Sequence, residues 1–323
     1  MQRINITKND SGQRLDKFLQ KSFPLLGKNL CYKAIRTKRV KVNNRRSYAE
    51  QFLHEGDILE LYINDEYLIR KQTGCEKSIH NAGSDCADII LYEDENILIA
   101  DKPQGVPCHS GDKKLADNLI NRLHAYLYGK GEYGSDTDFS FKPALCNRID
   151  RNTSGLVILA KNSASLREIN ERIRTRQVRR FYLCLVQSVN LPEKGSLKNY
   201  YRKDETANKA IVREYAGEPE NGETTVECKY HVVRTLGNIS LLEIELITGK
   251  SHQIRAQLAA AGAQILGDVK YGACRSDKSG YKYQALCAYK LVFDFQTAAG
   301  VMDYLRGRSF ETKKVPFNNI LHD

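Results

Sequence analysis

Hydrophobic positions near the N-terminus recur first at helical spacing. In the segment SGQRLDKFLQKSF, the apolar side chains Leu15, Phe18 and Leu19 fall on one face of a helix, and Ser11 precedes them as a candidate N-cap. A second helix is predicted over residues 30–37. Two short helices are therefore expected at the start of the chain.

Alternating polarity follows the second helix. The segment RVKVNN alternates Val40 and Val42 with basic residues before an Asn-Asn turn, and GDILELYI alternates as a half-buried strand after a glycine. Two helices followed by a small basic sheet form a compact module, which we place at residues 1–64. Residues 65–88 lose periodicity and are mostly polar, so we expect a linker there.

From Ile89 onward, short apolar runs typical of strands alternate with a few helical segments. The strand-like runs are IILYE, NILIADK, GLVILAK, RRFYLCLV, ISLLEIELI and ALCAYKLVFDF. Helices are predicted over about residues 164–175 and 252–261. This order predicts an α+β fold for residues 89–323, with a large, mixed, mainly antiparallel sheet and flanking helices.

The balance of charge favours a polyanionic partner. The chain has 323 residues, with 50 lysines and arginines against 39 acidic residues, which gives a formal net charge of +11. Residues 28–46 contain eight basic side chains and no acid: Lys28, Lys33, Arg36, Lys38, Arg39, Lys41, Arg45 and Arg46. We interpret this run as an RNA-binding patch, and the alternative is an ordinary solvated face.

Cysteine spacing and hydropathy exclude several classes of protein. Nine cysteines are an odd number without a CxxC pair, so neither a disulfide framework nor a zinc site is expected. Cys108 and His109 are neighbours, but further ligands at metal spacing are missing. We predict no metal and no cofactor. The start MQRINITKND has no apolar leader and no apolar run reaches ~18 residues, so we expect a cytoplasmic monomer without membrane contact.

One carboxylate stands out in the segment ALCNRIDRNTSGLVILAKN. Asp150 lies between Arg148 and Arg151, before a turn and an apolar strand. It is either a reacting group or a residue that caps its own turn. Rival sites fail on spacing, because GKS at residues 249–251 lacks the earlier glycine of a phosphate loop and neither GxSxG nor GxGxxG occurs at the required context. His252, like His109, is interpreted as a turn or cap residue.

Two resemblances join these segments. The motifs YEDENILIADKPQG, NRIDRNTSG, RRFYLCLV and LITGKSHQIRAQLAAAGAQILGDVKYG, in this order, resemble the RluA-type RNA pseudouridine synthases from about Ile90 to Phe295. In front of them, GQRLDKFL, the basic second helix, VKVNN and GDILEL resemble the small RNA-binding domain first known from a ribosomal small-subunit protein. That domain usually has a glycine where this chain has Arg39.

The first resemblance implies roles for particular residues. Asp150 matches the catalytic carboxylate of the HRLDxxTSG motif, and Arg148 matches the arginine thought to fill the space left by the flipped base. Tyr182 matches the tyrosine that packs on the target uracil, and Arg255 matches the arginine that pairs with the carboxylate. The chain departs from the family pattern at three positions, which are Asn147 for His, Ile149 for Leu and Ser251 for Thr.

These residue types suit the implied reaction. Moving the uracil attachment from nitrogen 1 to carbon 5 needs a nucleophile or base and no redox cofactor, and a carboxylate suffices. A buried carboxylate stays ionised beside an arginine, for which Arg255 is the candidate. A stacked base must also be flipped out, which calls for an aromatic platform such as Tyr182 and a filling side chain such as Arg148.

The expected partner is structured RNA. Ribosomal RNA is the first expectation and transfer RNA stays open, because the choice of uridine depends on RNA shape. The alternative to an enzyme is a non-catalytic RNA-binding or ribosome-assembly factor. Such a protein would be expected to lose Asp150, Tyr182 or Arg255 first, and all three are present.

Overall fold

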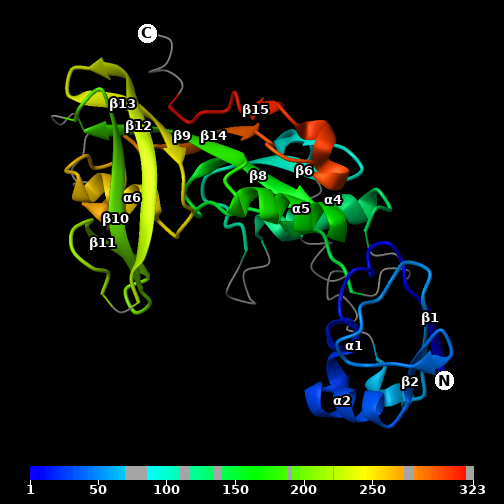
Figure 1. Cartoon of the computed structure of the whole chain (residues 1–323). Coiled ribbons are helices and arrows are strands. Elements are labelled where there is room, and N and C mark those ends of the chain that lie inside the picture. The colour runs from blue at the N-terminus through cyan, green and yellow to red at the C-terminus, as the bar shows by residue number, and fades with distance from the viewer. Residues whose placement is uncertain are drawn as a thin grey trace. The chain divides into compact units, whose positions relative to one another are not determined.

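The computed structural model describes residues 1–69, 86–109, 117–133, 140–187, 191–220, 222–272 and 280–317. The chain divides into two compact units (Figure 1). The first comprises Met1–Cys86, Ile120–Ala144 and Ala160–Leu166, and the second comprises Ala87–Leu119, Leu145–Leu159 and Arg167–Asp323. The central part of the predicted linker, residues 70–85, lies outside the described residues.

Two helices and a four-stranded antiparallel sheet form the N-terminal part of the first unit. The helices are α1 (Leu15–Ser22) and α2 (Lys28–Arg36). The strands, in sheet order, are β1 (Gln2–Asn5), β4 (Ile58–Leu61), β2 (Val40–Val42) and β3 (Arg45–Arg46). Leu15, Phe18 and Leu19 are fully buried in a core that also contains Val40 and Val42, as the hydrophobic pattern predicted.

The expected N-cap at Ser11 is wrong. Helix α1 begins at Leu15, its N-cap is Arg14, and no side chain caps it. The Ser11 hydroxyl instead donates to the carbonyl of Lys8 at 2.9 Å. The backbone N–H of Leu15 donates to the Gln51 carbonyl at 2.8 Å, so pairing with a distant segment fixes the helix start. The start of the helix is therefore decided by a tertiary contact and not by the local capping signal.

The turn after α2 explains how Arg39 replaces the expected glycine. Lys38 takes the left-handed conformation at φ 61°, one position before Arg39. The N–H of Arg39 then donates to the Ala34 carbonyl at 2.9 Å, which closes the helix end in the manner usually provided by glycine. Because the positive φ falls on Lys38, a side chain at Arg39 meets no backbone restriction.

An eleven-stranded sheet dominates the rest of the described chain. In order along the sheet, its main path is β11 (Lys209–Glu214), β10 (Lys194–Asp204), β12 (Thr224–Leu236), β13 (Ile239–Leu246), β9 (Val178–Gln187), β14 (Leu286–Phe293), β8 (Ser154–Ala160), β6 (Ile97–Lys102) and β5 (Ile90–Glu93). In addition, β15 (Ser309–Glu311) pairs with β14, and β7 (Ala144–Leu145) pairs with β8.

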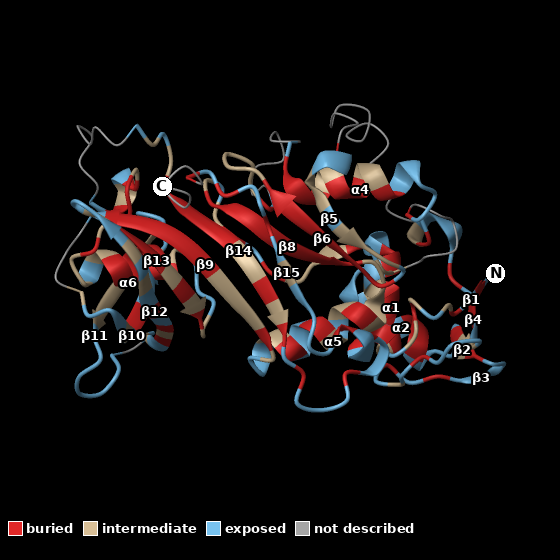
Figure 2. Cartoon of the chain, turned by 90° about the horizontal axis from the view of Figure 1, so that it is seen from above, coloured by how far each residue is buried: buried red, intermediate tan, exposed pale blue. Residues whose placement is uncertain are grey.

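The sheet is mixed and mainly antiparallel, which confirms that prediction. Strands β14 and β8 pair in parallel. Neighbours in the run β9, β13, β12, β10 and β11 are antiparallel. The pairs β9 with β14, β14 with β15 and β5 with β6 are antiparallel as well. Strands β6 and β8 are buried along their whole length (Figure 2). Their sequences are mainly apolar because both faces are covered, although β6 ends in the buried Asp101 and Lys102.

Helices are fewer than strands in this part of the chain. The α-helices are α4 (Leu119–Gly129), α5 (Ser163–Arg174) and α6 (Gln253–Ala260). Short 3₁₀ helices here are η3 (Ala87–Ile89), η4 (Val269–Tyr271) and η5 (Gly300–Leu305), and the N-terminal part has two more, η1 (Pro24–Leu26) and η2 (Asp65–Tyr67). Helices α5 and α6 agree within two residues with the two helices that the sequence pattern predicts.

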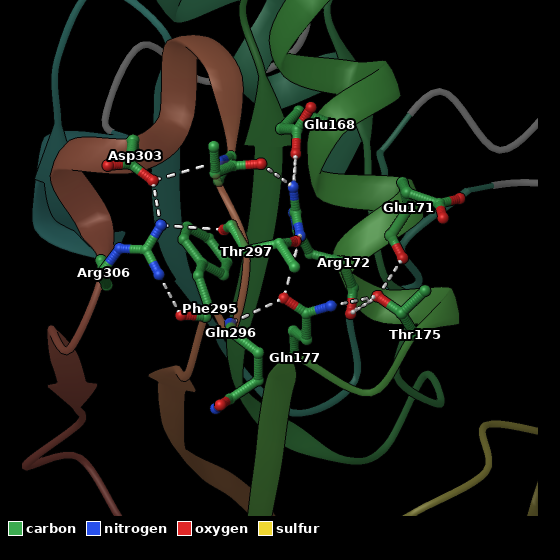
Figure 3. A network of polar contacts seen from close by, with 12 residues as sticks. Glu168, Glu171, Arg172, Thr175, Gln177, Phe295, Gln296, Thr297, Asp303 and Arg306 are labelled. Carbon is green, nitrogen blue, oxygen red and sulfur yellow. Dashed lines mark hydrogen bonds and ion pairs between the residues drawn. The ribbon is translucent and has the colours of Figure 1, made fainter.

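A polar network anchors the C-terminal end of α5 to the segment after β14 (Figure 3). Arg172 donates to Glu168 at 2.6 Å, to Gln177 at 2.9 Å and to the Thr297 hydroxyl at 2.7 Å. Its guanidinium also lies 5.5 Å from the ring centroid of Phe295. The helix is thereby fixed against the core cluster of Phe293, Phe295 and Met302 without relying on apolar contacts alone.

Candidate active site

A cleft in the second unit gathers the residues that the sequence motifs singled out. Its cavity has a volume of about 480 Å³. The lining comes from residues 107–109, from the segment 145–153 around the β7–β8 connection, from strand β9, and from residues 249–255 at the start of α6. Arg148, Asp150, Tyr182 and Arg255 all line it, so the structure brings the four predicted residues together.

Asp150 lies in the connection that leads into β8, with its side chain about one-fifth exposed. The turn is closed by its backbone carbonyl, which accepts from the N–H of Thr153 at 3.1 Å. The carboxylate instead accepts from the Arg255 guanidinium, with 2.9 Å between Nη1 and Oδ2. The alternative that Asp150 serves only to cap its own turn therefore does not describe where its side chain lies.

Arg255 joins two carboxylates. Besides Asp150, it donates from Nε and Nη2 to the two oxygens of Asp268, each at 2.7 Å, in a bidentate pair. Burial alone would lower the pKa of Arg255, but Asp268 and then Asp150 raise it above its ordinary value. The expected contact between Arg255 and Asp150 is confirmed. Asp268 was not singled out from the sequence, although it lies within the quoted GDVKYG motif.

Strand β9 presents Tyr182 to the cleft. Side chains alternate along a strand, so Arg180 and Tyr182 share the face that lines the cavity. Tyr182 is only 6% exposed, and burial raises its pKa to about 12, so the phenol is neutral at physiological pH. Tyr182 is thus both part of the strand core and part of the cleft wall.

Lys102 is a buried cation beneath the same cleft. It ends β6, is fully buried, and donates from Nζ to the carbonyls of Pro103, Val106 and Arg151 at 2.9, 2.7 and 3.0 Å. Burial lowers its pKa to about 8. The ammonium ties the segment after β6 to the residue that follows Asp150. Lys102 lies within the quoted motif YEDENILIADKPQG, but its burial could not be predicted from sequence because lysine is rarely buried.

His252 precedes α6 but does not cap it with its side chain. The residue has φ 55°, and its Nδ1 lies 3.0 Å from the hydroxyl of Tyr271, which also accepts from the Ala210 N–H. Nδ1 and the Tyr271 hydroxyl thus form one hydrogen bond, whose donor depends on the histidine tautomer. Nε2 lies 3.9 Å from Oδ2 of Asp150. Burial lowers the pKa of His252, which keeps the imidazole neutral.

The departure from the family pattern at Asn147 has a structural explanation. Asn147 is buried, its Oδ1 accepts from the Ile158 N–H at 2.8 Å, and its Nδ2 donates to the Leu156 carbonyl at 3.3 Å. The side chain pairs with the backbone of β8 on both of its polar atoms. Arg148, the next residue, is exposed at the cleft.

Within the described ranges, no helix is both long and apolar enough to cross a membrane. Nor do three or more His, Cys, Asp or Glu side chains come together there in a group that could hold a metal ion. The cysteines of these ranges, seven in number, carry free thiols, and all except the half-buried Cys146 are buried.

One protein-family model matches the part of the chain that forms most of the cleft. The family model described as RNA pseudouridylate synthase matches residues 96–260. This range contains Lys102, Asp150, Tyr182 and Arg255 and ends with helix α6. The match therefore covers the strands and loops that build most of the cleft.

Relatives match over nearly the whole chain. A Mycoplasma capricolum protein named as an uncharacterized RNA pseudouridine synthase is 31% identical over 311 residues, covering 95% of this chain and 96% of the relative. Ribosomal large subunit pseudouridine synthase C of Escherichia coli K12 is 30% identical, covering 83% of this chain and 79% of that protein. Human RNA pseudouridylate synthase domain containing 4 shares the fold, with a TM-score of 0.55 at 21% identity over 74% of this chain and 92% of that structure. The chain therefore belongs to the RNA pseudouridylate synthase family, and it is an enzyme that isomerises uridine in RNA to pseudouridine.

Proposed function

We propose that this enzyme modifies uridine in structured ribosomal RNA and that Asp150 supplies the reacting carboxylate. The observation that carries the assignment of Asp150 is its 2.9 Å ion pair with Arg255, whose guanidinium is itself held by Asp268. This fixed cation holds the Asp150 side chain in place where it lines the cleft. Asp268 is fully engaged by the same guanidinium, so Asp150 is the carboxylate that faces the cavity.

The reaction needs little more than this carboxylate. Uridine and pseudouridine are isomers, so the bond from nitrogen 1 to the sugar breaks, a bond from carbon 5 forms, and a proton moves from carbon 5 to nitrogen 1. Electrons balance without an oxidant or reductant. Asp150 serves either as a nucleophile at the sugar or as a base, and Arg255 holds its carboxylate in position for either role.

Tyr182 and Arg148 complete the proposed site. A uracil in structured RNA has to leave its stack, at a cost of a few kcal/mol, before it can reach Asp150. The Tyr182 ring, on the cleft wall formed by β9, offers the base an aromatic surface. Arg148 is exposed at the cleft, where its long side chain is free to enter the space that the base leaves.

Ribosomal RNA is the proposed substrate because of the names of similar proteins. Relatives from Escherichia coli and Rickettsia felis, each covering at least 80% of this chain, are named as ribosomal large subunit pseudouridine synthase C. We further infer a cytoplasmic enzyme that acts as a monomer. Transfer RNA is the alternative substrate, and mapping the modified sites distinguishes the two.

The first unit is proposed to bind the RNA. Seven of the eight basic side chains of residues 28–46 are exposed, and Lys41 is half-buried. A groove of about 520 Å³ lies along α2, and its lining includes Lys28, Lys33, Arg36, Arg46 and the exposed Tyr48. Basic side chains beside an exposed aromatic ring suit phosphates and unstacked bases. We place this RNA-binding domain at residues 1–64 and the catalytic domain at 89–323, joined by the linker.

The substrate assignment is tested by mapping pseudouridine in total RNA from cells with and without the gene. We expect one or more uridines of large-subunit ribosomal RNA to lose the modification. Loss confined to transfer RNA would replace the proposed substrate, and ribosomal RNA with unchanged modification would overturn the ribosomal assignment.

The role of Asp150 is tested on the purified enzyme. Asp150→Ala and Asp150→Asn should reduce pseudouridine formation below about 1% of the native rate while RNA affinity changes less than about tenfold, because the carboxylate acts in the chemical step. Asp294→Asn, at an exposed position outside the cleft, is the control. Substantial turnover by Asp150→Ala would remove Asp150 from the mechanism.

RNA binding by the first unit is tested with two charge-matched triple variants of the full chain. Changing Lys33, Arg36 and Arg46 to Gln should weaken binding and make its logarithmic salt dependence shallower by ~0.7–0.9 for each phosphate that is no longer bound. The control changes Lys8, Lys17 and Lys21, which are exposed in the same unit but lie outside the groove. Equal effects of the two triples would mean that net charge alone matters.

A further inference from the structure

Arg180 lines the cleft but takes no part in the ion pairs of the site. Within the described chain its guanidinium has no carboxylate partner, and its buried Nε has no hydrogen-bond acceptor. Its neighbour Arg179, on the opposite face of β9, pairs with Glu245 at 2.7 Å. A buried polar atom without a partner in the protein is costly, so the Arg180 guanidinium has hydrogen-bonding capacity that the protein leaves unused.

The charge around Arg180 favours an anionic ligand. Among the residues that line the cleft, Asp150 is the acid, and its carboxylate is already paired with Arg255. Arg148, Arg151, Arg180 and Lys250 add positive charge to the same lining. Arginine recognises phosphate through two parallel hydrogen bonds, whereas neutral uracil offers only carbonyl acceptors.

A glycine at the edge of the cleft lies close to the Arg180 guanidinium. A Cβ atom built on Gly249 would lie 2.8 Å from Nη1 and 3.4 Å from Nη2 of Arg180. Gly249 and Lys250 are both exposed, so the guanidinium reaches solvent beside them. A flipped nucleotide turns about its backbone, so its flanking phosphates stay at the entrance while the base enters.

We propose that Arg180 binds a backbone phosphate next to the target uridine, and that Gly249 leaves room for this guanidinium. The proposal rests on the proposed function, because it takes the RNA bound at Asp150 as its ligand. Arg180 then acts in binding and register, and not on the reacting atoms.

The test measures affinity and single-turnover rate on an unmodified transcript of large-subunit ribosomal RNA. Arg180→Gln should raise the dissociation constant about 10- to 100-fold, as expected for a charged hydrogen bond, and make the salt slope shallower by ~0.7–0.9. The rate at saturating RNA should stay within about threefold. Arg180→Lys should retain the salt slope but bind more weakly than the native enzyme, and Gly249→Ala should weaken binding in the same direction by displacing the guanidinium. Arg179→Gln is the control for removal of an arginine from β9.

The phosphate interaction itself is tested with RNA that carries one neutral methylphosphonate linkage 5′ or 3′ of the modified uridine. The native enzyme should bind more weakly at one of these linkages, and Arg180→Gln should show no further weakening there. An unchanged dissociation constant for Arg180→Gln, or a slower saturated rate at unchanged affinity, would overturn the proposal. Binding is measured apart from turnover, so failure of the transcript to be modified would count against the substrate assignment alone.

Discussion

Lys102 Nζ donates a 3.0 Å hydrogen bond to the backbone carbonyl of Arg151, the residue that follows Asp150. The same ammonium holds the carbonyls of Pro103 and Val106. One buried side chain thus fixes the connection before β8 to the segment after β6. The position of the proposed catalytic carboxylate therefore depends on a cation that is hydrogen-bonded to the neighbouring backbone.

Replacing Lys102 with Met should therefore affect both folding and catalysis. Methionine keeps much of the volume but leaves three carbonyls without their donor, so the free energy of unfolding should fall by about 2–4 kcal/mol. Pseudouridine formation should fall at least tenfold at a temperature where the variant is folded. Urea denaturation and single-turnover assays measure the two effects. The exposed Lys313→Met is the control, and equal behaviour of both variants would contradict the anchoring role.

Asp268→Asn should show that Arg255 needs both of its carboxylate partners. An amide accepts one hydrogen bond from the guanidinium but removes a buried charge, so we expect a loss of about 2–4 kcal/mol in unfolding free energy. Turnover should fall about tenfold or more, because Arg255 is free to turn away from Asp150. Asp303→Asn removes the charge from a half-exposed pair with Arg306 and should cost much less stability than Asp268→Asn. A fall in stability without any fall in the rate of the folded variant would argue against this orienting role.

Gly155→Ala should lower the free energy of unfolding more than most small substitutions in the second unit. Gly155 pairs with Ala288 where β8 meets β14, has φ 113°, and a Cβ there would lie 2.2 Å from the Ala288 carbonyl oxygen. The strands must separate, so we expect a loss above about 3 kcal/mol in urea denaturation.

Gly237→Ala is the control that measures the cost of backbone strain alone, without the steric clash expected at Gly155. Gly237 also has a positive φ, at 57°, but a Cβ there would meet nothing within 4 Å. It should cost only about 1 kcal/mol. Similar losses for the two variants would mean that strain alone explains the requirement for glycine at position 155.

The residues that could be predicted from sequence are those with strong local signals. Asp150 stands between two arginines before a Thr-Ser-Gly turn, and Arg255 lies in an ordered motif, so both were selected. Asp268 and Lys102 lie in the quoted motifs as well, but their roles could not be predicted because they depend on contacts made by folding. Asp268 lies 13 positions after Arg255, and Lys102 belongs to a residue type that is usually exposed.

For the fold as well, features set by local sequence could be predicted, and features set by distant contacts could not. Alternation and apolar runs predicted the strands and the α+β class, because burial sets those patterns directly. The parallel pairing of β14 with β8 had no local signal, since these strands are far apart in sequence. The predicted N-cap at Ser11 is wrong because the hydrogen bond from the Leu15 N–H to the Gln51 carbonyl fixes where α1 starts.

Changing pH should reveal the buried state of His252. Burial lowers its pKa below the ordinary value of 6.5, Arg255 and Lys270 lower it further, and Asp150 and Asp268 oppose the shift. As pH falls below about 6.5, the unfolded chain binds a proton that the native protein refuses. The stability that the neutral imidazole contributes is therefore fully present above pH 6.5 and is lost as pH falls toward the lowered native pKa.

Substituting the histidine should remove this dependence. His252→Gln cannot titrate, so the free energy of unfolding of the native protein should decline relative to this variant between about pH 7.5 and about pH 5.5, by less than about 1.4 kcal/mol per pH unit. Urea denaturation of both proteins at three pH values measures the difference. His231→Gln, whose ring is half exposed beside Glu243, is the control for an exposed histidine. If the gap between the native protein and His252→Gln stayed constant with pH, the imidazole would titrate alike in the folded and unfolded states. The neutral His252 described beside Asp150 would then have to be abandoned.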